Sequence, residues 1–129
     1  MNKEMVRVYV GHSSSFDFKG ELYDVLKNSL LSDSFAFVFP HEHSSEPVQT
    51  QKILPSCSFM LAEASYPSTG LGIELGFAFD LGVPIIFLVR KGSSVSSSLK
   101  VVSDIFVFYE GKADLCDALS SVLREQGLL

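Results

Sequence analysis

Short apolar runs alternate along the chain with longer stretches in which apolar residues recur every three or four positions. The short runs are rich in β-branched and aromatic residues and predict strands over Val6–Val10, Ser34–Phe39, Ser58–Ala62, Pro84–Val89 and Asp104–Tyr109. The longer stretches predict helices over Asp17–Leu31, Val48–Leu54, Thr69–Leu81 and Ala113–Glu125, and a loop or short helix over Ser93–Ser98. Gly82 is suited to end the third of these helices.

This alternation of strand and helix is typical of an α/β fold with a parallel sheet. Right-handed crossovers favour a single-domain, doubly wound, flavodoxin-like sheet of five strands with helices on both faces, spanning residues 1–129. Such sheets bind ligands beyond the carboxyl ends of their strands. The segments that should contain a site are therefore Tyr9–Ser15, Phe39–Ser45, Glu63–Gly72 and Arg90–Ser98.

Charge and composition narrow the classes of partner. The formal net charge of −5 argues against a nucleic acid polymer or a membrane surface, each of which would need a basic face. The longest apolar run, Val83–Val89, is too short to span a bilayer, and Met1–Val10 does not resemble a signal peptide, so we expect a cytoplasmic protein. The chain has 20 serines but only three arginines, so a bound anion would be held mainly without guanidinium groups.

The segment Glu63–Gly76, EASYPSTGLGIELG, combines a strand end, a turn with small residues and the start of a helix. Gly70 and Gly72 would let the backbone approach a ligand closely, and the helix N-terminus would favour a phosphate. The glycine spacing matches neither the dinucleotide-binding pattern nor a P-loop. The segment therefore predicts a ligand site of another kind.

Two carboxylates in this segment need an explanation. Glu74 lies in an almost entirely apolar helix, which would be buried all round, where an unpaired carboxylate is costly. It could pair with Arg7 or Lys52, face solvent, or act chemically. Glu63, at a strand end, could cap the next helix or face a ligand.

Glu63–Gly76 with Ala78 resembles the signature of the nucleoside 2-deoxyribosyltransferase superfamily, which includes 2'-deoxynucleoside 5'-phosphate N-hydrolases. The resemblance extends from Tyr9-Val-Gly11 to the serine cluster after Arg90. It implies that Glu74 is the nucleophile at the anomeric carbon and that Tyr9 lies beside it. It also implies contacts from Ser68, and from Ser98 of a neighbouring subunit, to the 5' end of the substrate.

The same resemblance implies a small-molecule substrate, a nucleoside or its 5'-monophosphate, with no cofactor and no metal. A homodimer or larger homo-oligomer with composite active sites is expected. Gly11, His12, Glu63, Gly70 and Gly72 complete the candidate substrate-binding residues.

Glutamate suits this chemistry, because a carboxylate can attack the oxocarbenium-like centre and form a glycosyl-enzyme intermediate. A Tyr hydroxyl beside it could orient the carboxylate and tune its pKa. The family usually places an Asp before the third strand to protonate the leaving base, but Val48–Ser56 contains no carboxylate. Glu42 or Glu46 could supply the acid, the substrate could differ, or the domain could bind nucleotides without catalysis.

Other polar and aromatic groups support weaker hypotheses. His41 and His43 flank Glu42 on a polar loop, which more often indicates a solvated or substrate-facing patch than a metal site. Phe16 and Phe18 could stack on a base, although packing of the first helix is the more common role for such residues.

Overall fold

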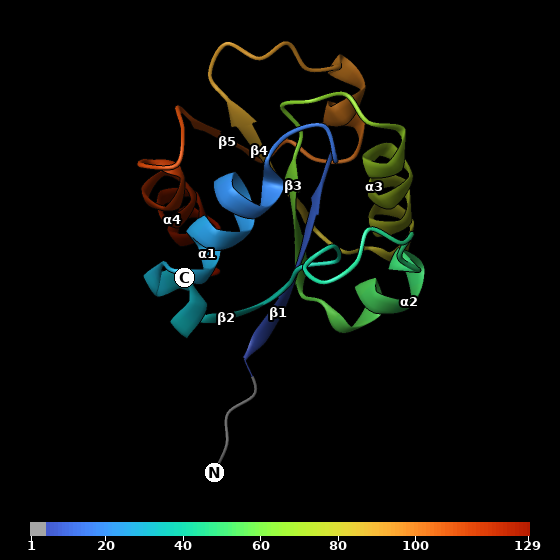
Figure 1. The fold of residues 1–129 in the computed structure, drawn as a ribbon, viewed down its shortest axis with the longest axis horizontal. Coiled ribbons are helices and arrows are strands. Elements are labelled where there is room, and N and C mark those ends of the chain that lie inside the picture. The colour runs from blue at the N-terminus through green and yellow to red at the C-terminus, as the bar shows by residue number, and fades with distance from the viewer. Residues whose placement is uncertain (1–4) are drawn as a thin grey trace.

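The computed structural model describes residues 5–129 (Figure 1). Residues 1–4 lie outside the described residues. They include Lys3 and Glu4 of Met1–Val10, the segment that does not resemble a signal peptide. The remainder forms a five-stranded sheet with helices packed on both faces, as the alternating pattern predicted.

The five strands are β1 (Val6–His12), β2 (Phe35–Val38), β3 (Phe59–Glu63), β4 (Ile85–Arg90) and β5 (Phe106–Tyr109). All neighbouring pairs are parallel, and the order across the sheet is β2-β1-β3-β4-β5. The prediction of a doubly wound, flavodoxin-like fold is therefore confirmed. β1 extends two residues beyond the predicted strand, because Gly11 and His12 pair with Ala62 and Glu63 at the end of β3.

Two apolar cores lie on opposite faces of the sheet, and successive strand residues alternate between them as the pleat requires. On the face covered by α1 (Asp24–Lys27) and α4 (Leu115–Glu125), Val8, Val10 and Leu61 are buried. On the face covered by α2 (Thr50–Ile53) and α3 (Thr69–Leu81), Tyr9 and Met60 are buried. The pleat thus decides which site residues can meet, since Tyr9 faces α3 while its neighbours face α1.

The first predicted helix, Asp17–Leu31, is not continuous. It consists of a π-helical turn over Lys19–Tyr23, followed by α1, and a separate 3-10 turn over Leu30–Asp33. Ser29 causes the break, because its backbone is extended and its hydroxyl accepts a hydrogen bond from the Leu31 N–H at 3.2 Å. Hydrophobic periodicity alone could not reveal this local competition.

The other elements deviate from the predictions mainly at their ends. α2 is shorter than predicted and passes into a 3-10 turn over Leu54–Ser56, which contains Pro55. The serine-rich loop after β4 leads to a 3-10 turn over Ser97–Val101. α3 has the predicted bounds and ends at Gly82, whose φ of 73° lies in the left-handed region.

α3 is not buried all round, contrary to the expectation from its apolar sequence. Leu71, Leu75 and Ala78 pack on the sheet, whereas Ile73 and Phe79 are each 56% exposed. The apolar residues of α3 therefore lie on its exposed face as well as on the face that packs on the sheet.

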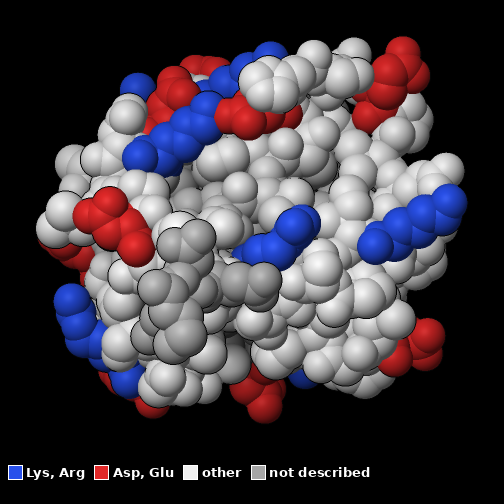
Figure 2. Space-filling model, turned by 90° about the horizontal axis from the view of Figure 1, so that it is seen from below, with Lys and Arg blue, Asp and Glu red and all other residues white. Residues whose placement is uncertain are grey.

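The surface at the amino ends of the strands carries Lys, Arg, Asp and Glu side chains interspersed with uncharged residues (Figure 2). This face has no continuous basic patch in the part that the structure describes. None of the helices within residues 5–129 combines the length and apolar character needed to cross a membrane.

Candidate active site

A cavity of about 360 Å³ lies beyond the carboxyl ends of β1 and β3, where the strand order reverses direction. This is the position at which doubly wound sheets bind ligands, and the volume is at the lower end of the range for small-molecule sites. The lining comes from the β1 end, the loop after β2, the start of α2, and α3 with its N-cap: His12, Ser14, His41, Pro47, Val48, Thr50, Ser68, Gly70, Leu71, Ile73, Glu74 and Phe77.

Glu74 lies in this cavity, and its two carboxylate oxygens differ in the hydrogen bonds that they accept. Oε2 accepts hydrogen bonds from the Tyr9 hydroxyl and, at 2.7 Å, from the Thr50 hydroxyl. The two hydroxyl oxygens are 3.1 Å apart. Oε1 has no hydrogen-bond donor among residues 5–129, so one oxygen is held and the other is available to a ligand.

Tyr9 is fully buried, and its pKa is raised, first by burial and then by the neighbouring Glu74 carboxylate. The hydroxyl therefore keeps its proton near neutral pH and donates a hydrogen bond to Glu74. The alternatives in which Glu74 pairs with Arg7 or Lys52 are not seen, since Tyr9 and Thr50 are its polar partners among the described residues.

Thr50 was not identified from the sequence. It opens α2, and it occupies the stretch in which the family resemblance led us to look for a carboxylate. The hydroxyl is buried and directed at Glu74, so it positions that carboxylate. The available signal was its place near the start of a short helix before β3, but a lone Thr in a polar segment is too common to be diagnostic.

Gly11 provides the space in which the Glu74 carboxylate lies. A Cβ added at this position would overlap Met60 Cε and would lie 3.2 Å from Leu71 Cδ1 and 3.6 Å from Glu74 Oε1. A side chain here would require Met60 and Leu71 to shift, and it would come into van der Waals contact with the Glu74 carboxylate. The predicted role of Gly11 as a residue of the site thus has a steric basis.

Ser68 and Gly70 line the cavity at the start of α3. The Ser68 hydroxyl accepts from the Leu71 N–H at 3.2 Å and so caps the helix, which leaves its own proton free to donate to a ligand. Gly72 instead borders a neighbouring hollow of about 110 Å³ that also contains Ser94 and Ser96. The structure thus brings Gly70 into the cavity but directs Gly72 away from it.

His12 is buried at the cavity edge within a defined chain of hydrogen bonds. Its Nδ1 lies 2.8 Å from the Ser13 carbonyl oxygen, which can only accept, so Nδ1 carries the proton. Its Nε2 then accepts from the Tyr23 hydroxyl at 2.6 Å, and that hydroxyl accepts from the His41 N–H at 3.1 Å. Burial lowers the pKa of His12 to about 4, so its imidazole is neutral near pH 7.

Glu63 does not line the cavity. It follows Leu61 at a two-residue interval and therefore faces the α1 and α4 side. Its carboxylate is fully buried and accepts from the Ser65 N–H at 2.6 Å, the Ser65 hydroxyl at 3.0 Å and the Tyr109 hydroxyl. The structure does not bring Glu63 to the cavity, and its contacts tie the end of β3 to β5.

Ser98 and the two candidate acids of the loop after β2 lie outside the lining of the cavity. Ser98 is exposed at the 3-10 turn after β4. Glu42 is bound to Lys27, and this hydrogen bond lowers its pKa, so it is ionised and poorly suited to donate a proton. Glu46 is exposed.

A second hollow of about 420 Å³ adjoins the cavity and shares Ser14 and His41 with it. Its other walls include Phe18, Lys19 and His43. No Lys or Arg of the described chain lines the Glu74 cavity itself, so positive charge near the site comes from this adjoining hollow. Within residues 5–129, no three His, Cys, Asp or Glu side chains cluster as metal ligands would.

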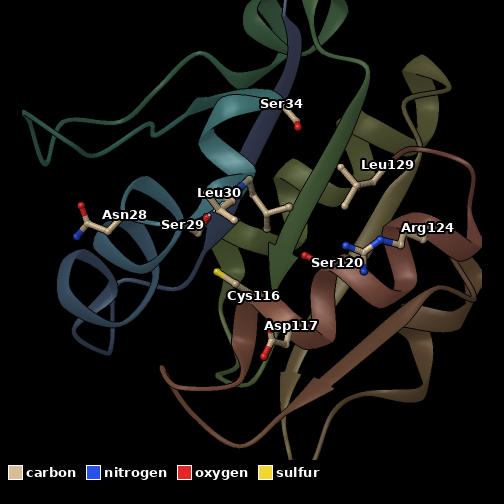
Figure 3. A pocket seen from close by; sticks show the side chains of 10 residues that line it. Asn28, Ser29, Leu30, Ser34, Cys116, Asp117, Ser120, Arg124 and Leu129 are labelled. Carbon is tan, nitrogen blue, oxygen red and sulfur yellow. Dashed lines mark hydrogen bonds between the residues drawn. The ribbon is translucent and has the colours of Figure 1, made fainter.

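A larger hollow, of about 660 Å³, opens on the α1 and α4 side of the sheet (Figure 3). Figure 3 shows Cys116, Asp117, Ser120 and Arg124 of the last helix facing it, with Ser34 opposite. None of the residues that the sequence singled out for chemistry lines this hollow. The candidate active site is therefore the smaller cavity around Glu74.

Fold and cavity define an α/β protein of flavodoxin-like topology with a carboxylate at the sheet's switch point. Two solved structures share this fold. A Clostridium botulinum CMP N-glycosidase, BcmB, matches with a TM-score of 0.67 and 20% identity over 89% of this chain and 98% of that chain. A conserved protein from Enterococcus faecalis V583 matches with a TM-score of 0.58 and 10% identity over 98% of this chain and 100% of that chain.

The comparisons by sequence give no match. No family model matches the chain, and no curated protein matches it. At these identities the structural likeness shows the fold, and the assignment of function depends on the residues of the site.

Proposed function

We propose that this protein cleaves the N-glycosidic bond of a nucleoside or nucleoside 5'-monophosphate, with Glu74 as the nucleophile. The observation that carries the proposal is the Glu74 carboxylate, which has Oε2 held by two hydroxyls and Oε1 available in a cavity at the switch point of the sheet. The name of one protein with the same fold, a CMP N-glycosidase, supports this reaction class.

In the proposed reaction, Oε1 attacks the anomeric carbon as the bond to the base nitrogen breaks. A glycosyl-enzyme ester forms, and water then releases the sugar and restores the carboxylate. Tyr9 and Thr50 hold Oε2, so the carboxylate does not have to be oriented during the reaction. Both hydroxyls donate to the same oxygen, so Oε1 keeps its lone pairs for the attack.

The 5' end of the substrate would lie against the start of α3. The free hydroxyl proton of Ser68 and the exposed backbone N–H groups of the first helical turn can donate to a phosphate without an arginine. Ser98 does not line its own subunit's cavity and would reach the substrate of a neighbouring subunit, as the resemblance implies.

A homo-oligomer would also cover the outward face of α3. Ile73, Phe79 and Leu81 are exposed there, at 56%, 56% and 46%, and Ile73 also lines the cavity. A second subunit at this face would bury the exposed apolar side chains and would also close the cavity. The measurement is the mass of the protein in solution by light scattering, for the wild type and for Phe79→Asp; a monomeric wild type would contradict this part of the proposal.

The experiment that tests the function is incubation of the purified protein with ribonucleosides, deoxynucleosides and their 5'-monophosphates, followed by chromatography for free base. Release of base by the wild type, and its loss in Glu74→Gln, is the expected result. Addition of a second free base would show whether a new nucleoside forms, which distinguishes transfer from hydrolysis. Base release that persists in Glu74→Gln would contradict the nucleophile assignment.

A second function, nucleotide binding without catalysis, is favoured by one observation. No carboxylate besides Glu74 lines the described cavity, so the acid that the family resemblance predicts is missing. Thermal stabilisation by a nucleotide, without release of base over prolonged incubation, would identify the protein as a binding domain.

A further inference from the structure

Cleavage of an N-glycosidic bond needs a proton donor for the departing base in addition to a nucleophile. The acidic and basic side chains that line the cavity are Glu74, His12 and His41. Glu74 must be ionised to attack. The candidates for the acid are therefore the two histidines.

His12 is unsuited to this role. Its Nδ1 proton is committed to the Ser13 carbonyl, and its Nε2 lone pair is committed to the Tyr23 hydroxyl. Burial lowers its pKa to about 4, so few molecules carry the extra proton at neutral pH. Its position in the chain of hydrogen bonds instead makes it part of the support for the cavity wall.

His41 differs from His12 in its exposure and in the partners of its ring. Its backbone N–H is anchored by the Tyr23 hydroxyl at 3.1 Å, and its ring lies edge-on to His12 with centroids 5.7 Å apart. The ring is partly exposed and borders both the Glu74 cavity and the adjoining hollow. Its Nδ1 lies 3.3 Å from the Ser44 carbonyl oxygen, to which it can donate, so Nε2 is free to act on a ligand.

We propose that His41 is the general acid for the leaving base, a role that rests on the proposed function. As the C1'–N bond breaks, its electron pair stays on the base, and the Nε2 proton of the His41 imidazolium transfers to the base. The Glu74 Oε1–C1' bond forms in the same step. The neutral His41 then accepts a proton from the water that attacks C1', and the Glu74 carboxylate leaves.

Charged and titratable side chains lie near His41 on several elements of the fold. Glu74 lies across the first cavity, and Lys19 and His43 border the second. Glu42, the next residue in the chain, is neutralised by Lys27 and lies 3.3 Å from the His43 ring. Phe18 and His12 supply the remaining ring contacts, and both are uncharged near neutral pH.

The test compares His41→Gln with the wild type on two kinds of substrate. One is the natural nucleotide that the wild type cleaves, and the other is a 4-nitrophenyl glycoside of the same sugar, with the same 5' group. We expect His41→Gln to lower kcat for the nucleotide by about 100-fold or more. We expect its kcat for the nitrophenyl glycoside to stay within about 3-fold of wild type, because nitrophenolate departs without a proton.

Two control variants separate the possible failures. His43→Gln changes the neighbouring histidine, whose side chain is 89% exposed, and should match the wild type on both substrates. Glu74→Gln should lose both activities. Equal losses on both substrates in His41→Gln, or no loss on either, would reject the acid role while leaving the proposed function intact. A wild type inactive on both substrates would reject the function and this role with it.

Discussion

Glu63 and Glu74 are two carboxylates of one sequence segment, each bound to a tyrosine hydroxyl, yet they lie in opposite environments. Glu63 is fully buried on the α1 and α4 side, and both of its oxygens accept hydrogen bonds. Glu74 is partly exposed on the α3 side, and its donors among the described residues converge on Oε2 alone. The two carboxylates thus differ in hydrogen bonding as well as in burial, because among the described residues only Glu74 has an oxygen without a donor.

The pKa of Glu63 illustrates the same difference. Burial raises its pKa, while the hydrogen bonds from Tyr109 and Ser65 oppose that effect. This carboxylate is thus part of a closed polar network that joins the ends of β3, β4 and β5, since the Ser65 hydroxyl also accepts from the Arg90 N–H at 2.7 Å. Such a network stabilises the edge of the sheet but leaves no oxygen for a substrate.

The largest effect should come from Glu74→Gln, which removes the nucleophile. We expect kcat to fall on the order of 10⁴-fold or more, because an amide cannot form the ester intermediate. Stability should change little, since the site is partly exposed. Base release and thermal unfolding, measured on the same preparation, check both statements; a variant that retains most of the activity would remove Glu74 from the reaction.

The same substitution at the other carboxylate, Glu63→Gln, should show the reverse pattern. An amide offers one acceptor oxygen where three donors converge, so we expect a loss of about 1–3 kcal/mol of stability. The folded fraction should keep its activity within a few fold. Denaturant unfolding gives the stability, and a Glu63→Gln protein that is stable but inactive would place Glu63 in the site after all.

Thr50→Val should have a smaller effect on activity. The substitution preserves shape but removes one hydrogen bond to the Glu74 carboxylate, which is worth about 1.5–3 kcal/mol for a charged acceptor. We expect kcat to fall about 10-fold to 100-fold with KM nearly unchanged. Thr50→Ser, which keeps the hydroxyl, should restore most of the rate; equal losses in both variants would show that the hydroxyl does not matter.

The last prediction concerns His12 and the stability of the fold in acid, with no change of activity expected at neutral pH. Its folded-state pKa of about 4 lies below the value of about 6.5 for an unfolded chain. Its contribution is therefore fully present above pH 6.5 and is lost as the pH falls towards 4, by up to about 1.4 kcal/mol per pH unit. The raised pKa of Glu63 acts with the opposite sign, so comparison with a variant is needed.

The comparison is the unfolding free energy of wild type and His12→Gln between pH 7 and pH 4. The wild type should lose stability more steeply than His12→Gln as the pH falls. Parallel curves for wild type and His12→Gln would show that His12 takes up its proton equally in both states.

Much of this architecture could be predicted from the sequence because it depends on local pattern. The run Phe59–Glu63 is apolar up to its last residue and is buried on both faces, as a central parallel strand requires. Thr69–Leu81 carries its own cap at Ser68 and its own stop at Gly82, so its bounds were predictable. Glu74 was noticeable because it is a charged residue in the middle of the apolar stretch Leu71–Phe79.

The tertiary structure decided which of these residues meet. The pleat of β1 turns Tyr9 towards α3 and His12 towards α1, and the pleat of β3 turns Glu63 away from the cavity. Thr50 reaches Glu74 across 24 positions of sequence, a contact that no local pattern records. Periodicity reports which face of an element is apolar, but the pairing of polar groups across elements depends on register and packing, which only the folded chain specifies.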